Sequence, residues 1–279
     1  MQKDFSSAVF DNSNGAGTPK AFGDEISMLP PREIFRSDQR DERLFGGELG
    51  CRQGPRLRDD EVTRIRELIK ERLVYNAGNL NRKEVDLISN CSLDQYHTVS
   101  SHFDHQKMLC KAGRILSKEA VEEIRSMSIF DYFKEGLGSF DLADEDNVGH
   151  EQVCFRVVRP NMKEDVGSLH CDSWFWDYYN WPTPAGQNRL KVWVPICVDA
   201  GKNGLIAVPG SHTEDRLYQT KLAGHKIAFE PGFDISNLDY RLFDRPAGTT
   251  FLFNYFMLHV GAANISATTR VSIEFTVLY

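Results

Sequence analysis

The spacing of hydrophobic residues changes from helix-like to strand-like at about residue 150, and the first clear helical pattern begins at Asp59. There, apolar residues recur every three or four positions, the spacing that places side chains on one face of a helix. The members of this stripe are Val62, Ile65, Leu68, Ile69 and Leu73. An aspartate at the start and Gly78 beyond the last member are typical of helix ends. We therefore predict an amphipathic helix between these two positions.

A second helix is predicted to begin at Ser117, since the apolar residues that follow share one helical face. They are Val121, Ile124, Met127 and Phe133. The glycines within residues 136–138 end the pattern. Residues 1–30, by contrast, combine Ser, Asn, Gly and Asp with few periodic apolar positions. This composition predicts a loosely packed N-terminal arm.

After residue 150, short runs of β-branched and aromatic residues are separated by turn residues, which predicts β-strands. The runs cover residues 153–159, 189–198, 205–209, 249–255 and 270–279. Helices first and strands later favour a mainly β fold, a sandwich or barrel, with N-terminal helices. We expect residues 31–279 to form a single domain, with helical support over 31–150 and the β core over 151–279.

Length and charge limit the classes of function. A chain of 279 residues with 41% hydrophobic composition has enough apolar material for one substantial core. It has 33 Lys and Arg residues against 40 Asp and Glu residues, a net charge of −7. Proteins that bind nucleic acid or anionic membranes use basic faces. We therefore expect a small-molecule partner, and no nucleic acid or membrane partner.

Three features of the sequence predict a cytoplasmic protein. No stretch approaches the ~20 apolar residues of a membrane-spanning helix. The first residues lack the basic and apolar regions of an export signal. The six cysteines are scattered without a Cys-x-x-Cys pair, so we expect reduced thiols rather than a zinc ribbon or a redox motif.

Candidate chemistry begins with the segment Gly167-Ser-Leu-His170-Cys-Asp172. In a strand or at a strand end, side chains two residues apart project to the same side, so His170 and Asp172 are placed to bind one metal ion. A third ligand is expected from a distant strand, and His259 follows the apolar run at 249–255. Two histidines and one carboxylate leave metal positions open for substrates, which is typical of non-heme Fe(II) oxygenases.

Arg270 and Ser272 stand at the start of the last predicted strand, where both point to the same side. An arginine fork beside a hydroxyl suits a carboxylate that is buried in a pocket. We therefore expect these two residues to bind an acidic ligand.

Together with three motifs in the middle of the core, these residues resemble the phytanoyl-CoA dioxygenase-like family of Fe(II)- and 2-oxoglutarate-dependent oxygenases. The motifs are Leu190-Lys-Val-Trp-Val-Pro-Ile, Asp199 with Asn203-Gly204, and Val208-Pro-Gly-Ser-His212. The resemblance covers about residues 150–279, and its motifs occur in the family's order. It implies a double-stranded β-helix, or cupin-like jelly roll, with iron at its mouth.

The resemblance also implies ligands and cosubstrates. Iron(II) is implied at His170, Asp172 and His259, which form the catalytic centre. Three residues are implied at the cosubstrate: Arg270 at the distal carboxylate of 2-oxoglutarate, Ser272 beside it, and Trp193 along the wall. The second cosubstrate is O2, and ascorbate is expected as a stimulant. Succinate and carbon dioxide would form while a C–H bond of the substrate is oxidised.

The aromatic run after Asp172 allows two interpretations. Its rings are Trp174, Phe175, Trp176, Tyr178, Tyr179 and Trp181. In the first interpretation, about half of the rings pack as core. In the second, Trp174 or Trp176 overhangs the iron and contacts the substrate.

Two further His-x-acid motifs are present, His102-Phe-Asp104 and His212-Thr-Glu214. The first lies in a polar stretch without strand alternation, and the second follows a Pro-Gly turn. We expect the first motif to be structural or on the surface, and the second to stabilise a loop.

These inferences predict an enzyme that hydroxylates a C–H bond of a small metabolite. A carboxylate at Asp172 favours C–H oxidation over halogenation, for which relatives carry a small residue there. Two alternatives remain open: desaturation, epimerisation or cyclisation at the same site, and a non-catalytic jelly-roll protein that binds a ligand. The metal triad together with Arg270 favours an enzyme, because ligand binding alone has no need for both.

Overall fold

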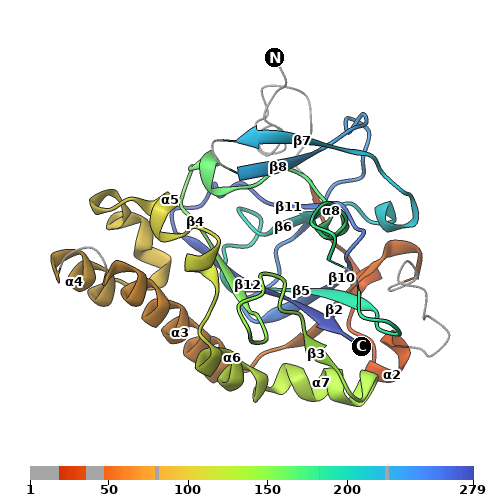
Figure 1. Ribbon diagram of the computed structural model, residues 1–279, viewed down its shortest axis with the longest axis horizontal. Coiled ribbons are helices and arrows are strands. Elements are labelled where there is room, and N and C mark those ends of the chain that lie inside the picture. The colour runs from red at the N-terminus through yellow and green to blue at the C-terminus, as the bar shows by residue number, and fades with distance from the viewer. Residues whose placement is uncertain (1–18, 36–46, 79–81, 182, 224–225) are drawn as a thin grey trace.

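Two facing β-sheets form the centre of the structure, a computed structural model that describes residues 19–35, 47–78, 82–181, 183–223 and 226–279 (Figure 1). The predicted arm over residues 1–30 falls mostly outside the described residues. Its described end contains strand β1 (Lys20–Ala21), and Phe22 and Ile26 beyond it are buried. This end of the segment is therefore packed against the sheets.

The larger sheet has the strand order β2-β10-β5-β12-β3, and β4 also pairs with β12. Its strands are β2 (Cys51–Arg56), β3 (Asp141–Leu142), β4 (Cys154–Val158), β5 (Arg189–Cys197), β10 (Thr249–Asn254) and β12 (Arg270–Leu278). All of these pairs are antiparallel. Four of the five predicted strand runs form strands of this sheet, and the fifth forms a strand of the smaller sheet. All five predicted runs are therefore confirmed.

The smaller sheet has the order β1-β9-β6-β11 and covers the inner face of the larger one (Figure 1). Its other strands are β6 (Leu205–Ala207), β9 (Arg241–Phe243) and β11 (His259–Gly261). A separate hairpin is formed by β7 (Tyr218–Ala223) and β8 (Lys226–Pro231). The two facing sheets form a double-stranded β-helix, so the predicted fold class is confirmed.

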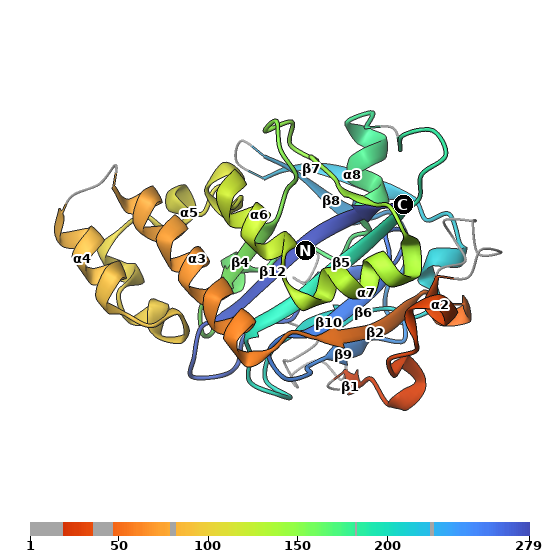
Figure 2. The same ribbon diagram turned by 90° about the horizontal axis from the view of Figure 1, so that it is seen from below.

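The longer helices of the N-terminal half lie against the outer face of the larger sheet (Figure 2). The α-helices are α2 (Pro31–Ile34), α3 (Asp59–Ala77), α4 (Arg82–Asn90), α5 (His105–Met108), α6 (Lys118–Arg125), α7 (Ser128–Leu137) and α8 (Asp172–Tyr178). Short 3-10 turns are η2 (Asp24–Ile26), η3 (Gly47–Leu49), η4 (Leu93–Thr98), η5 (Ser100–His102), η6 (Ala112–Arg114), η7 (Lys163–Asp165) and η8 (Ser211–Thr213). Within the described ranges, no helix has the length and apolarity to cross a membrane.

The helix predicted from Ser117 is wrong in one respect, because the chain forms two helices there. Helix α6 ends at Arg125 and α7 begins at Ser128. The Glu61 carboxylate accepts hydrogen bonds from the backbone N–H and the hydroxyl of Ser128 at 2.7 and 2.6 Å. A distant residue on α3 therefore caps a new helix start, which local spacing does not reveal.

Side chains alternate between the two faces of the larger sheet. Alternate residues of β5 and β12 join the apolar core shared with the helices: Leu190, Val192, Val194, Ile196, Val271, Ile273, Phe275 and Val277. The intervening residues face the space between the sheets, and several of them are polar. The residues on this inner face include Lys191, Trp193, Arg270, Ser272 and Glu274. This inner face is the wall on which the candidate site is built.

Replacing Glu61 with alanine should lower the free energy of unfolding by about 2–4 kcal/mol, because three partly buried donors lose a charged acceptor whose own side chain is buried. The third donor is the backbone N–H of Arg58 at 2.8 Å. Urea unfolding followed by circular dichroism measures the change. Glu67→Ala is the matched control, since its carboxylate is 57% exposed and should cost less than about 1 kcal/mol. Equal losses in both variants would contradict the proposed bridge between α3 and α7.

Candidate active site

His170 and His259 are brought together by a short backbone pairing. Each residue donates its N–H to the carbonyl of the other, at 3.1 and 2.8 Å, and the two ring centroids lie 4.5 Å apart. Asp172 is the first residue of α8, and Cys171 is the N-cap. Residues 170–172 therefore form a strand end, one of the two predicted arrangements, with His170 in the bridge to His259 and α8 beginning at Asp172.

The three side chains converge on one point. Asp172 lies 3.9 Å from His170 Nε2 through Oδ1 and 3.8 Å from His259 Nε2 through Oδ2. One ligand atom from each of the three residues lies within 4.8 Å of the others. Across the described ranges, no other group of three His, Cys, Asp or Glu side chains meets this condition.

Hydrogen bonds to the backbone fix the orientation of both imidazoles. His170 Nδ1 lies 2.7 Å from the carbonyl of Ser168, and His259 Nδ1 lies 3.0 Å from that of Met257. A carbonyl only accepts, so Nδ1 carries the proton and Nε2 keeps a free lone pair. Metal-binding histidines are oriented by such bonds. Both lone pairs therefore face Asp172.

The protonation states suit a divalent cation. Burial, followed by the neighbouring His259, lowers the pKa of His170 to about 4, so this imidazole is neutral at pH 7. Burial opposes ionisation of Asp172, but the charge of the neighbouring Lys191 favours it, and the pKa of Asp172 lies below its usual value. Since metal ligands must be deprotonated, these residues fit the iron(II) that the sequence predicts.

Arg270 is a buried cation whose guanidinium binds backbone carbonyls. Its Nη1 donates to Gly204 and, at 3.2 Å, to Ala262. Within the described chain, its Nε and the Ser272 hydroxyl are buried without a hydrogen-bond partner. Burial lowers the pKa of Arg270 to about 10, so the group remains charged at pH 7. These unpaired donors beside a buried positive charge fit a carboxylate.

Trp193 lies on the same inner face, directly opposite Glu274 on β12 and Phe251 on β10. It is buried, and its ring packs edge-on against Phe243 with 6.1 Å between centroids. Arg156 stands opposite Ser272 but donates from Nε to Glu274 at 2.9 Å. Along β5, Trp193 is two residues from Pro195, the residue that pairs with Ser272.

The two tryptophans proposed for the substrate occupy different surroundings. Trp174 is buried in an apolar cluster with Leu169 and Val208, and its indole N–H donates to the Arg216 carbonyl at 3.1 Å. This placement favours the packing interpretation for Trp174. Trp176 is half-buried, and the Arg189 guanidinium stacks on its ring.

The sequence placed none of three nearby residues, Phe175, Lys191 and Glu145, beside the candidate metal ligands. The Phe175 ring lies edge-on to His170 with 5.2 Å between centroids. Lys191 Nζ lies 3.7 Å from Asp172 Oδ2 and 3.7 Å from Glu145 Oε1. The sequence offered one indication for Lys191: it lies two residues from Trp193 on one strand, so both side chains point to the same face. No local signal identifies Glu145, which comes from a loop.

The other His-x-acid motifs lie outside the metal-binding group. His102 is exposed on η5, and the Asp104 carboxylate caps α5 by accepting from the Lys107 N–H at 3.0 Å. His212 is buried in the turn η8. His102 thus lies on the surface and His212 lies within a loop, as expected for each motif.

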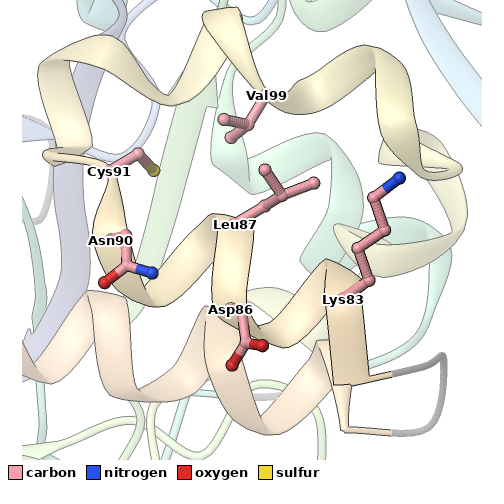
Figure 3. Close-up of a pocket in the computed structure, with 6 residues that line it drawn as sticks. All are labelled: Lys83, Asp86, Leu87, Asn90, Cys91 and Val99. Atoms are coloured by element: carbon pink, nitrogen blue, oxygen red, sulfur yellow. The ribbon is translucent and has the colours of Figure 1, made fainter.

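A hollow on the helical side of the molecule is separate from this centre. It is lined by Lys83, Asp86, Leu87, Asn90, Cys91 and Val99, mainly from helix α4 (Figure 3). Helix α4 packs against α3 at the edge of the molecule. The hollow contains none of the metal-binding residues.

Comparison with solved structures finds similar folds at low sequence identity. The non-heme monooxygenase ThoJ in its apo form is 13% identical, with a TM-score of 0.50, over 89% of this chain and 76% of that chain. EctD from S. alaskensis, with 2-oxoglutarate and 5-hydroxyectoine, is 13% identical, with a TM-score of 0.49, over 93% and 82%. The α-ketoglutarate-dependent carbocyclase SnoK from nogalamycin biosynthesis is 14% identical, with a TM-score of 0.48, over 86% and 83%.

A search of curated protein sequences finds no significant match. The family model for phytanoyl-CoA dioxygenase (PhyH), however, matches residues 56–272. This span covers more than half of the chain and contains the three candidate metal ligands together with Arg270 and Ser272. The chain therefore belongs to the phytanoyl-CoA dioxygenase family of non-heme iron, 2-oxoglutarate-dependent oxygenases.

Proposed function

We propose that the protein hydroxylates a C–H bond of a small metabolite, with iron(II) at His170, Asp172 and His259. The observation that supports this most is the inner face of the β-helix, which carries both a convergent metal-binding group and a buried arginine with unpaired donors beside it. The same pair of features weighs against a non-catalytic binding protein, because ligand binding alone needs either a metal-binding group or a buried arginine, but not both.

Different residues are proposed to bind the metal, to bind the cosubstrate and to exclude water. The two imidazoles and the Asp172 carboxylate would hold iron(II), and Arg270 with Ser272 would bind the distal carboxylate of 2-oxoglutarate. Bound iron would supply oxidising chemistry with O2, while 2-oxoglutarate gives up two electrons and leaves as succinate and carbon dioxide. Trp193 is buried against Phe243 and Phe251, so it keeps water from this part of the site.

The substrate is proposed to lie beside Trp176. Trp176 follows Asp172 by about one helical turn, and Arg189 precedes Lys191 by two positions in β5. Each shift moves the side chain about 5–7 Å along its element. The Trp176–Arg189 stack thus stands next to the Asp172–Lys191 contact. Lys191 and Glu145 provide polar groups on the same wall, which supports a small substrate with hydrogen-bonding groups.

Product analysis separates hydroxylation from the other outcomes. The protein is incubated with iron(II), 2-oxoglutarate, ascorbate and a panel of metabolites in air, and succinate release identifies a substrate. Hydroxylation adds one oxygen atom to that substrate, whereas desaturation or cyclisation removes two hydrogens and epimerisation leaves the mass unchanged. Absence of succinate with iron bound would favour the non-catalytic alternative.

Replacing Trp176 with alanine should lower substrate-dependent turnover by about tenfold or more, because stacking area beside the substrate is lost. Succinate released without substrate should change by less than about twofold, since the residues for iron and 2-oxoglutarate remain in place. The control is Tyr178→Ala, because this ring packs on Phe229 instead. Equal loss of coupled and uncoupled turnover in Trp176→Ala would assign this tryptophan to the core.

A further inference from the structure

The guanidinium of Arg270 reaches across from the larger sheet to the backbone of the smaller one. Gly204 precedes β6, and Gly261 ends the neighbouring strand β11. The Gly204 carbonyl accepts from the Ala262 N–H at 3.0 Å and also from Arg270 Nη1. The Arg270 guanidinium therefore lies beside two glycines, one just before β6 and one at the end of β11.

At Gly261, the missing side chain matters because of space rather than backbone conformation. A Cβ at this residue would lie 2.8 Å from Arg270 Nη2 and 3.4 Å from Nη1, and its φ is outside the left-handed region. Gly204 differs, since its φ is +147° and a Cβ there would lie 2.3 Å from the Phe243 carbonyl oxygen. Of these two glycines, Gly261 is the one that can be replaced without straining the backbone.

We propose that Gly261 is a positioning residue, whose empty Cβ position sets where the Arg270 guanidinium lies and hence the affinity for 2-oxoglutarate. This inference rests on the proposed function, in which Arg270 binds the distal carboxylate. A methyl group at residue 261 displaces the end of a flexible side chain, so the strands remain in place. Two-point recognition of a carboxylate by an arginine depends on orientation, and a small displacement weakens it.

The test compares Gly261→Ala with Gly167→Ala. Gly167 is the matched control because it precedes a metal ligand by three residues, has an ordinary φ and has open space around its Cβ position. Binding of 2-oxoglutarate is measured by calorimetry on Mn(II)-loaded protein without O2, and KM and kcat are measured by succinate release. Gly261→Ala should raise Kd and KM about tenfold, with kcat within about twofold and the circular dichroism spectrum of the folded protein retained. Gly167→Ala should match the wild type.

A double-mutant cycle identifies the residue through which Gly261 acts. Arg270→Met removes the fork, so adding Gly261→Ala to this variant should not change the Kd for 2-oxoglutarate further. A tenfold effect that persists in the Arg270→Met background, or a normal Kd in Gly261→Ala alone, would overturn the inference. If Arg270→Met itself binds 2-oxoglutarate like the wild type, then the proposed role of Arg270 is wrong, and the two failures are distinguished.

Discussion

A His259→Ala variant is expected to lose metal-dependent turnover altogether and to bind Mn(II) or Co(II) at least about 100-fold more weakly. The reason is that the imidazole supplies one of three convergent ligand atoms. The pairing of His259 with His170 uses backbone atoms, so the fold should persist without the ring. Calorimetric titration with the metal and circular dichroism measure the two quantities on the same sample.

The matched control for this variant is His102→Ala. His102 belongs to the other His-x-Asp motif but is exposed on η5. Its replacement should leave metal affinity and turnover unchanged. Full turnover in His259→Ala, or equal losses in both variants, would show that the metal is held elsewhere.

Arg270→Met is expected to raise the KM for 2-oxoglutarate by about 30-fold or more, because loss of a buried charge partner costs roughly 2–5 kcal/mol. The substitution removes the charge and the donors while filling a similar volume. Steady-state succinate release over a range of 2-oxoglutarate concentrations gives KM, and metal titration should remain normal.

Arg270→Lys is the informative comparison, since lysine keeps the charge but lacks the planar fork. It should show an intermediate KM for 2-oxoglutarate. If the KM stays at the wild-type value in Arg270→Met, another residue binds the distal carboxylate.

The strand runs and the metal-binding residues were predictable because both leave local patterns. Alternation along β5 and β12 separates a helix-facing apolar face from an inner polar face, and the sequence shows it directly. His170 and Asp172 stand two residues apart, and the apolar strand β10 precedes His259. Such patterns indicate residue types at a site, although not how the backbone joins them.

The features that were missed depend on contacts between distant parts of the chain. The start of α7 is set by Glu61 on α3, and the turn at Asp172 is set by the start of α8. Glu145 reaches Lys191 from a loop. The glycine at Gly261 is ordinary in the sequence, and only the position of Arg270 shows why a side chain is absent there.

The central claim is that this metal-binding group oxidises 2-oxoglutarate with O2. The most direct measurement is mass spectrometry of succinate that forms from 2-oxoglutarate under isotopically labelled O2 with iron(II) present. Oxidative decarboxylation places one oxygen atom from O2 in succinate, so we expect succinate with one labelled atom from the wild type and none from His259→Ala. Unchanged 2-oxoglutarate, in a wild-type sample that titration shows to be loaded with iron, would contradict the account.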